Sequence, residues 1–226
     1  MVNNQLGNLI IEINEGLLLD RNETKEVDKR EKIINAALKE FSKNGYKKTS
    51  IDEIVLEAGV SKGLVFHYFG SKKKLYLYLY EYCLKIMSEE IIQDINIDSM
   101  DVFQRYSEVQ RAKFIILKRH PYFSAFLIAA YYEENPQVYQ ELKVITEYYA
   151  KEQGVVQKAM SNIDYSGLIE GVSPDVFHKI VAWVSEGYLK EATGKLSIEE
   201  NLEVIFNDFD KYMRALKLGF YKEGEF

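Results

Sequence analysis

In "TSIDEIVLEAGVSKGLVFHYFG", residues 49–70, two short helical patterns are joined by a glycine turn. Ser50 and Glu53 have the spacing of a capping box, and Gly59 stands where a helix commonly ends on glycine. Ser61 then occupies another N-cap position, at the start of the second pattern. The stretch therefore predicts a helix-turn-helix, although two packed helices that bind no DNA have the same pattern.

A longer helical pattern precedes this stretch. Ile34, Ala37, Leu38 and Phe41 recur at the spacing of one helical face, and Gly45 closes the pattern. Because a helix-turn-helix buries little apolar surface by itself, we expect this face to pack against it and complete a three-helix domain.

Charge is distributed unevenly along the chain. Residues 27–76 hold eleven Lys and Arg against six Asp and Glu, a net charge of +5, whereas the whole chain has a net charge of −6. A basic segment on an acidic chain is typical of a part that meets a polyanion, although charge runs also cover ordinary solvated faces.

Three lysines, Lys72, Lys73 and Lys74, follow Ser71 at the expected start of a further helix. Cations there face the positive end of the helix dipole, at a cost of a few tenths of a kcal/mol, up to about 1 kcal/mol at low salt. With a DNA phosphate at this N-terminus, lysines would be favourable there, because backbone N–H and ammonium groups would bind the same anion. The alternative is that exposed lysines cost little.

Residues 33–75 closely resemble the N-terminal domain of the TetR/AcrR family of transcriptional regulators. The matching features are Ala36-Ala37, Phe41, Gly45-Tyr46, Thr49, Asp52 to Ile54, Ala58-Gly59-Val60-Ser61, Lys62-Gly63, Tyr68-Phe69, Ser71-Lys72 and Leu75. Three features depart from the family: Leu64 stands where a small hydroxyl residue is common, Val65-Phe66 replaces Leu-Tyr, and Lys73-Lys74 replaces acids.

The resemblance implies an all-α protein in three parts. Residues 1–26 form an N-terminal extension, residues 27–75 the helix-turn-helix DNA-binding domain, and residues 76–226 a helical effector-binding and dimerisation domain. The extension carries apolar residues at helical spacing, and an amphipathic helix, a strand or a disordered arm are the alternatives there.

The resemblance also implies which residues meet DNA. The helix from Lys62 to Phe69 would enter the major groove, with Lys62 donating to guanine, Gly63 admitting the backbone and Leu64 meeting a thymine methyl. We expect Phe66 and Phe69 in a small core. The other residues expected at the DNA, mostly on phosphates, are Thr49, Ser50, Ser61, His67, Tyr68, Lys72 and Lys73. Ser50 and Ser61 are also expected to act as plain caps.

Beyond residue 71 the periodicity predicts helices over 72–92, 101–118, 121–133, 136–161, 174–191 and 198–217. Asn135 before Pro136 and Ser173 before Pro174 have the arrangement of an N-cap followed by proline. The apolar faces of the last two helices are broader than one stripe, which suggests a second contact. The resemblance implies that these helices form a four-helix bundle with a second copy, through Phe177, Val181, Val184, Tyr188, Leu202, Phe206, Phe209 and Met213. A symmetric dimer sets two reading helices about 34 Å apart and predicts a palindromic operator.

Aromatic residues are numerous in the second part. If the body follows the family, several of them lie on helices around a central cavity: Tyr106, Phe114, Phe126, Tyr149 and Trp183. Aromatic residues at helical spacing are usually core, so these are candidates for effector binding only. An acidic, tyrosine-rich body would suit an apolar or cationic effector.

The sequence favours a regulator over an enzyme. It contains no HExxH, GxSxG, GxGxxG or Walker motif, and its three histidines have no ligands at metal-site spacing, so neither a metal nor a cofactor is expected. A single cysteine and the absence of a long apolar run predict a cytoplasmic protein that enters no membrane. The hypothesis is a homodimeric repressor that a small molecule releases from double-stranded DNA. The alternative is a DNA-binding or protein-interaction module of the same fold that responds to no small molecule.

Overall fold

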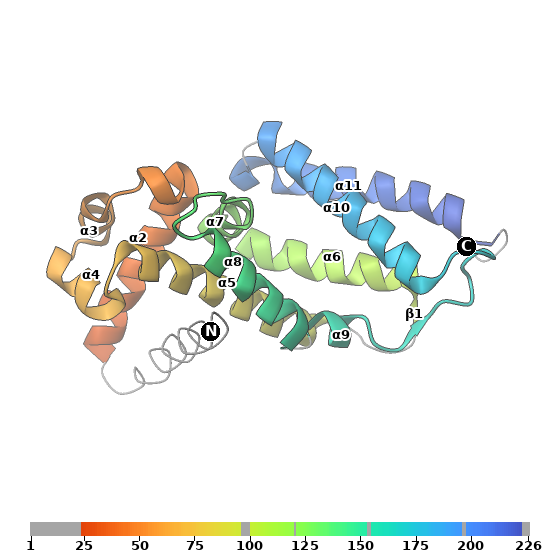
Figure 1. Ribbon diagram of the computed structural model, residues 1–226, viewed down its shortest axis with the longest axis horizontal. Helices are drawn as coiled ribbons and strands as arrows, with labels where there is room; N and C mark the ends of the chain where they lie inside the picture. Colours follow the sequence, from red (N-terminus) through yellow and green to blue (C-terminus); the bar gives the residue numbers. More distant parts are fainter. Residues whose placement is uncertain (1–23, 96–99, 120, 153–154, 196–197, 223–226) are drawn as a thin grey trace. The chain divides into compact units, whose positions relative to one another are not determined.

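The computed structural model describes residues 24–95, 100–119, 121–152, 155–195 and 198–222. Helices form most of this part of the chain (Figure 1). The helices are α2 (Thr24–Lys48), α3 (Ile51–Ala58), α4 (Lys62–Phe69), α5 (Lys72–Asp94), α6 (Val102–Arg119), α7 (Pro121–Tyr131), α8 (Tyr139–Glu147), the π-helical turn η1 (Tyr148–Glu152), α9 (Val155–Ala159), α10 (Pro174–Lys195) and α11 (Ile198–Phe220). Strands β1 (Met100–Asp101) and β2 (Ile163–Asp164) form one short parallel pair. The all-α expectation is confirmed.

The chain divides into two compact units. One holds Met1–Ile86 with Tyr122–Gln153, and the other holds Met87–Pro121 with Gly154–Phe226. Helix α5 starts in the first unit and ends in the second, so one helix carries residues of both. The predicted extension at residues 1–26 lies almost wholly outside the described residues.

The first unit has an aromatic core formed by residues of α2, α5 and α7. The ring centroid of Tyr76 lies 4.8 Å from that of Phe41, 5.1 Å from that of Tyr46 and 5.2 Å from that of Phe126. Gly45 has φ 68° and ψ 178°, which interrupts the helical geometry of α2 where the sequence predicts its end. The core thus ties the start of α5 to α2 and α7.

The second unit is built on α6, α10 and α11. Figure 1 shows α10 and α11 lying side by side. Helix α10 begins at Pro174, and Val176 N donates to Ser173 Oγ at 3.4 Å, as the predicted N-cap requires. The core of this unit contains Val102, Phe103, Leu168, Phe177, Val181, Phe209, Met213 and Tyr221.

The single helix predicted over 136–161 is wrong. Gln137 N donates to Asn135 Oδ1 at 3.0 Å, while Val138 N and Tyr139 N both donate to the Asn135 carbonyl. This local turn delays the start of α8 to Tyr139, because an asparagine side chain offers the backbone an alternative to a helical hydrogen bond. The π-helical turn then separates α8 from α9.

Candidate nucleic-acid interface

Capping residues determine where α3 begins and ends and where α4 begins. Glu53 N donates to Ser50 Oγ at 3.2 Å and Ser50 N donates to Glu53 Oε2 at 2.7 Å, which completes the predicted capping box. Gly59 ends α3 with φ 65°, a left-handed conformation that glycine adopts at little cost. Leu64 N donates to Ser61 Oγ at 3.3 Å and so starts α4. The helix-turn-helix is formed as the sequence predicts.

Helix α4 has one exposed side. Lys62, Gly63 and His67 are exposed, Leu64 and Tyr68 are half-buried, and Val65 and Phe69 are buried. The ammonium of Lys62 pairs with Asp52 of α3, with the nitrogen 2.9 Å from Oδ1 and 3.0 Å from Oδ2. Phe69 lies in the core as expected, whereas Phe66 is 40% exposed, against expectation.

Thr49 was expected to bind phosphate through its hydroxyl and backbone N–H, but both groups donate to carbonyls within the chain. Its side chain is 1% exposed. Thr49 Oγ1 donates to the carbonyl of Glu40 at 3.1 Å and to that of Gly45 at 2.9 Å. The hydroxyl therefore holds the end of α2 beside the start of α3.

The lysines at the start of α5 have partners inside the chain. Lys72 Nζ donates to the Thr49 carbonyl at 2.9 Å and lies 4.6 Å from the ring centroid of Tyr46. Lys73 Nζ pairs with Glu141 of α8 at 2.6 Å. These contacts join α5 to the end of α2, to the turn before α3 and to α8, and they account for cations at an N-terminus without any phosphate.

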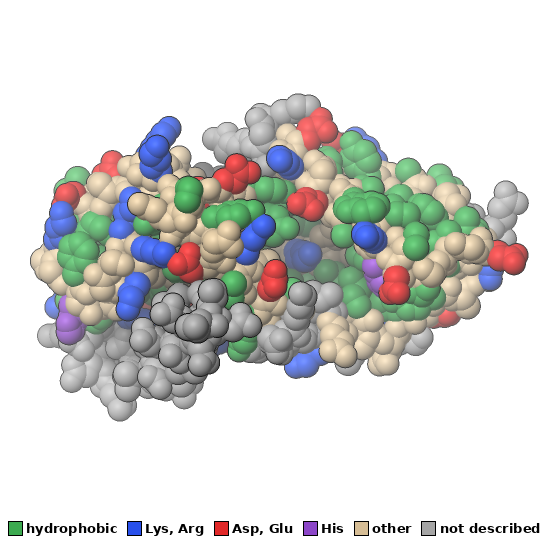
Figure 2. Space-filling model, in the orientation of Figure 1, with side chains coloured by type: hydrophobic (Ala, Val, Ile, Leu, Met, Phe, Trp, Pro, Cys, Tyr) green, Lys and Arg blue, Asp and Glu red, His purple; other side chains and the backbone are tan. Residues whose placement is uncertain are grey.

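Two cations that were not among the residues expected at DNA stand directly before Thr49. Lys47 and Lys48 are exposed in the last turn of α2, next to the N-terminus of α3. No ion pair found among the described residues involves either of them. Figure 2 shows Lys and Arg side chains gathered over the α2 to α4 end of the molecule. The basic charge of residues 27–76 was the sequence signal for them.

The five aromatic residues expected at an effector cavity are divided between the two units. In the first unit, Phe126 is buried in the aromatic core and Tyr149 is buried near α5. In the second, the Tyr106 hydroxyl lies 2.7 Å from His178 Nδ1, and the Phe114 ring lies 5.0 Å from that of Phe206. Trp183 is 61% exposed, so it does not line an internal cavity.

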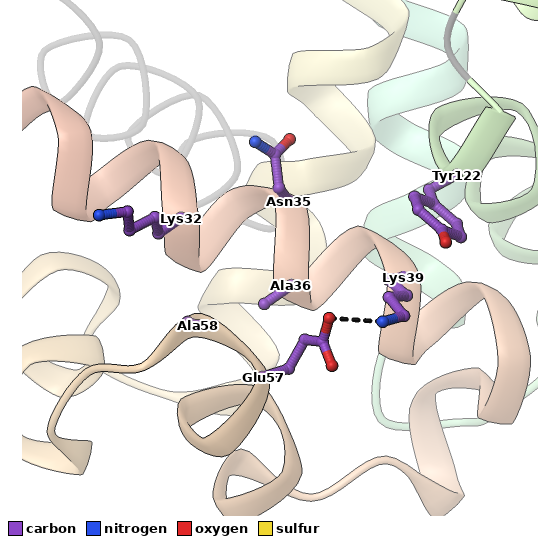
Figure 3. A pocket seen from close by; sticks show the side chains of 7 residues that line it. All are labelled: Lys32, Asn35, Ala36, Lys39, Glu57, Ala58 and Tyr122. Atoms are coloured by element: carbon purple, nitrogen blue, oxygen red, sulfur yellow. Dashed lines mark hydrogen bonds and ion pairs between the residues drawn. The ribbon is translucent and has the colours of Figure 1, made fainter.

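An open cavity of about 540 Å³ does occur in the first unit (Figure 3). None of the five candidate aromatic residues lines it. Lys39 and Glu57 form an ion pair across it, which raises the pKa of Lys39 and lowers that of Glu57. Its lining consists of Lys32, Asn35, Ala36 and Lys39 from α2, Glu57 and Ala58 from α3, and Tyr122 from α7.

Four of the eight residues expected at a dimer interface are already buried within one chain. Phe177, Val181, Phe209 and Met213 are at most 7% exposed and belong to the core of the second unit. Their assignment to the interface is therefore corrected: a stripe of apolar residues does not reveal whether the same chain or another covers it. Val184, Tyr188 and Phe206 are partly buried, and the side chain of Leu202 lies outside the part that the structure describes.

The exposed apolar residues of α10 and α11 differ from the expected set. Figure 2 shows hydrophobic side chains at the surface over α10. The large hydrophobic residues at least 45% exposed on these two helices are Val176, Trp183, Val204, Tyr212 and Leu218. We call these five residues the α10–α11 apolar surface.

The described residues contain neither a cluster of metal ligands nor a membrane-spanning helix. No group of three or more His, Cys, Asp or Glu side chains in the described ranges is placed to hold a metal ion. No helix in those ranges is both long enough and apolar enough to span a membrane. His178 is occupied by two tyrosine hydroxyls, because Tyr165 lies 2.7 Å from its Nε2 while Tyr106 lies at Nδ1.

Comparisons with known proteins agree with this geometry. The family model "Bacterial regulatory proteins, tetR family" matches residues 33–79, which include α3, α4 and the start of α5. The regulator HbdR of Aromatoleum sp. is 40% identical over 68 residues, which cover only 30% of each chain. The repressor AcnR of Corynebacterium efficiens is 24% identical over 189 residues, 80% of this chain and 90% of AcnR.

The fold of the whole chain has solved counterparts. The SmeT–triclosan complex has a TM-score of 0.62 at 17% identity, over 88% of this chain and 94% of that chain. SmeT is the repressor of the Stenotrophomonas maltophilia multidrug efflux pump SmeDEF. The matched relatives are transcription regulators and not enzymes. With a capped helix-turn-helix at the matched residues, residues 33–79 form a DNA-binding domain of the TetR type.

Proposed function

We propose that the chain is a homodimeric repressor whose α4 helices bind a palindromic operator and are released from it by a small-molecule effector. The observation that carries this proposal is the exposed side of α4, a helix capped at Ser61 and Gly70, together with the exposed Lys47 and Lys48 before α3. Repression is supported by AcnR and SmeT, which are named as repressors. Such a protein acts on DNA in the cytoplasm.

The proposal assigns separate roles at the DNA. Lys47, Lys48 and the N-terminus of α3 at Ser50 would bind phosphate, because backbone N–H groups and ammonium groups attract the same anion. The Lys72 ammonium donates one hydrogen bond to the Thr49 carbonyl, and its other N–H groups would also bind phosphate. Base edges would face the exposed side of α4, with His67 and Tyr68 beside the backbone and Ser61 as a cap.

Lys62 remains a base contact in this proposal although it pairs with Asp52. An exposed ion pair contributes only about 0 to 1 kcal/mol, so exchanging Asp52 for a guanine costs little. Lys62→Ala should therefore change sequence preference, whereas loss of a phosphate contact weakens binding to all sequences.

The effector is proposed to be an apolar or cationic small molecule. SmeT was solved with triclosan, which supports an aromatic ligand in this fold. Phe126 and Tyr149 are the two candidate residues that lie in the same unit as the helix-turn-helix. Because α5 contributes to both units, a ligand that changes the position of α5 would also act on the start of this helix next to α3. A coupling of about 1 to 3 kcal/mol is sufficient for release.

Duplex selection tests this function. The purified protein is incubated with a library of random duplexes, and the enriched sequences are bound again at increasing salt, with and without candidate effectors. We expect a palindrome whose affinity falls steeply with salt and which an effector displaces. Recovery of no salt-sensitive duplex contradicts DNA binding, whereas binding that no effector changes favours a module that responds to no small molecule.

A further inference from the structure

Phe66 occupies the centre of the exposed side of α4. At 3.6 residues per turn, Lys62, Gly63, Phe66 and His67 point to one side of this helix, and all four are exposed. Val65 and Phe69, on the adjoining side of the helix, are buried at 1% and 6% exposure and fill the core. Phe66 is thus not one of the buried core residues of its own domain.

The ring of Phe66 has no aromatic partner among the described residues, and 40% of the residue remains exposed. Its immediate surroundings are open. A Cβ placed on Gly63 would meet nothing within 4 Å, so a flat surface could come close to the helix at this point.

The charge on this side of α4 is also low. Asp52 neutralises Lys62, which stands one turn before Phe66. The centre of the surface is thus an aromatic ring beside an ion pair, with His67 at its edge. Such a surface favours an apolar group of the DNA over a phosphate.

We propose that Phe66 contacts the 5-methyl group of a thymine in each half of the operator. The thymine methyl is the apolar group that a base edge presents in the major groove, and phenylalanine is among the side chains that contact it. The sequence reasoning gave this role to Leu64, but Leu64 is half-buried while Phe66 is exposed. The inference rests on the proposed binding of α4 to a duplex.

Uracil substitution tests the inference without changing the protein. In the palindrome selected from random duplexes, each thymine is replaced in turn by uracil, which differs only by the lost methyl group. At one thymine per half-site we expect the dissociation constant to rise about fourfold, and about fifteenfold when both half-sites are changed. Replacement of the other thymines should have little effect.

Variants then assign the methyl contact to one side chain. Phe66→Ala should weaken binding to the thymine duplex and lose the uracil penalty, while Phe66→Leu should retain much of it. Leu56→Ala is the matched control, because Leu56 is an apolar residue 84% exposed on α3. It should keep both the affinity and the full uracil penalty.

The possible results separate the two proposals. A selected duplex without any uracil penalty, or a penalty of the same size in Phe66→Ala, overturns the methyl contact and leaves DNA binding intact. A selection that recovers no duplex overturns both. Equal melting temperatures of the wild type and Phe66→Ala establish that the variant is folded.

Discussion

A single buried hydroxyl determines how α3 begins. Thr49 Oγ1 bridges two carbonyls of α2, those of Glu40 and Gly45, and the Thr49 carbonyl in turn accepts from Lys72. Thr49→Val keeps the shape of the side chain but removes the donor. We expect it to lower the free energy of unfolding by about 1 to 2 kcal/mol, as measured by urea titration, because buried carbonyls lose their partner. If Thr49 bound phosphate instead, the valine variant would lose DNA affinity at unchanged stability.

Lys48 and Lys73 differ in what already binds their charge. Lys73 pairs with Glu141, whereas Lys48 is exposed beside the N-terminus of α3. In a plot of log affinity against log salt concentration, Lys48→Ala should reduce the slope by about 1. Lys73→Ala should leave the slope nearly unchanged. The opposite ranking would mean that the Lys73 pair opens when DNA binds.

Local signals in the sequence were sufficient for these helix ends. Capping depends on residues three positions apart, so Ser50, Glu53, Gly59 and Ser61 were assigned correctly from spacing. The partner of Lys73 lies 68 residues away and the acceptor of Lys72 lies 23 residues away. No local pattern indicates such pairs, and this is why the lysines were expected at phosphates.

At the scale of elements, α5 is joined to α8 by polar contacts along its length. Lys73 pairs with Glu141, and the Tyr80 hydroxyl lies 2.8 Å from Thr146 Oγ1. At the next residue of α5, Glu81 is fully buried, and neither of its oxygens has a hydrogen-bond partner of normal geometry among the described residues. Burial raises its pKa from 4.5 to about 7, and the nearby Tyr149 hydroxyl and Lys85 ammonium offset this only in part.

Glu81 should make the stability of the chain depend on pH. Between pH 4.5 and about 7 the unfolded chain releases a proton that the folded chain keeps, so stability falls as pH rises through this window and levels off above it. Glu81→Gln removes this dependence and should be more stable than the wild type by at most about 3 kcal/mol at pH 8, with little difference at pH 4.5. Urea unfolding at several pH values measures both.

The exposed Glu134 of the same unit provides the control for this prediction. Glu134→Gln should follow the wild type at every pH. A Glu81→Gln variant that is no more stable than the wild type at pH 8 would show that a partner or water satisfies the ionised carboxylate.

The sequence could not indicate that α8 ends in a π-helical turn or that α8 starts three residues after Pro136. Both depend on hydrogen bonds that compete with helical ones, and the spacing of apolar residues does not indicate where such bonds form. The buried Glu81 was likewise hidden, because a glutamate within a helix is usually exposed.

At the scale of the whole molecule, the periodicity of apolar residues did not distinguish core residues from interface residues. Phe177, Val181, Phe209 and Met213 have the spacing of a contact stripe, and the chain itself covers them. Only a structure separates them from the α10–α11 apolar surface. This surface, rather than the stripe, is where a second copy is proposed to bind.

Trp183 is the residue on which the dimer should depend most. It is 61% exposed, it lies on α10 in the α10–α11 apolar surface, and tryptophan is enriched among residues that dominate binding energy. Trp183→Glu places a charge there and should raise the dissociation constant of the dimer at least about 30-fold in sedimentation equilibrium. The monomer should stay folded, because the side chain contributes little to its own core.

Leu56→Glu is the matched control, since it adds the same charge at an exposed apolar residue of α3 and should leave the dimer unchanged. A Trp183→Glu variant that remains fully dimeric at the same concentration would place the interface on another surface.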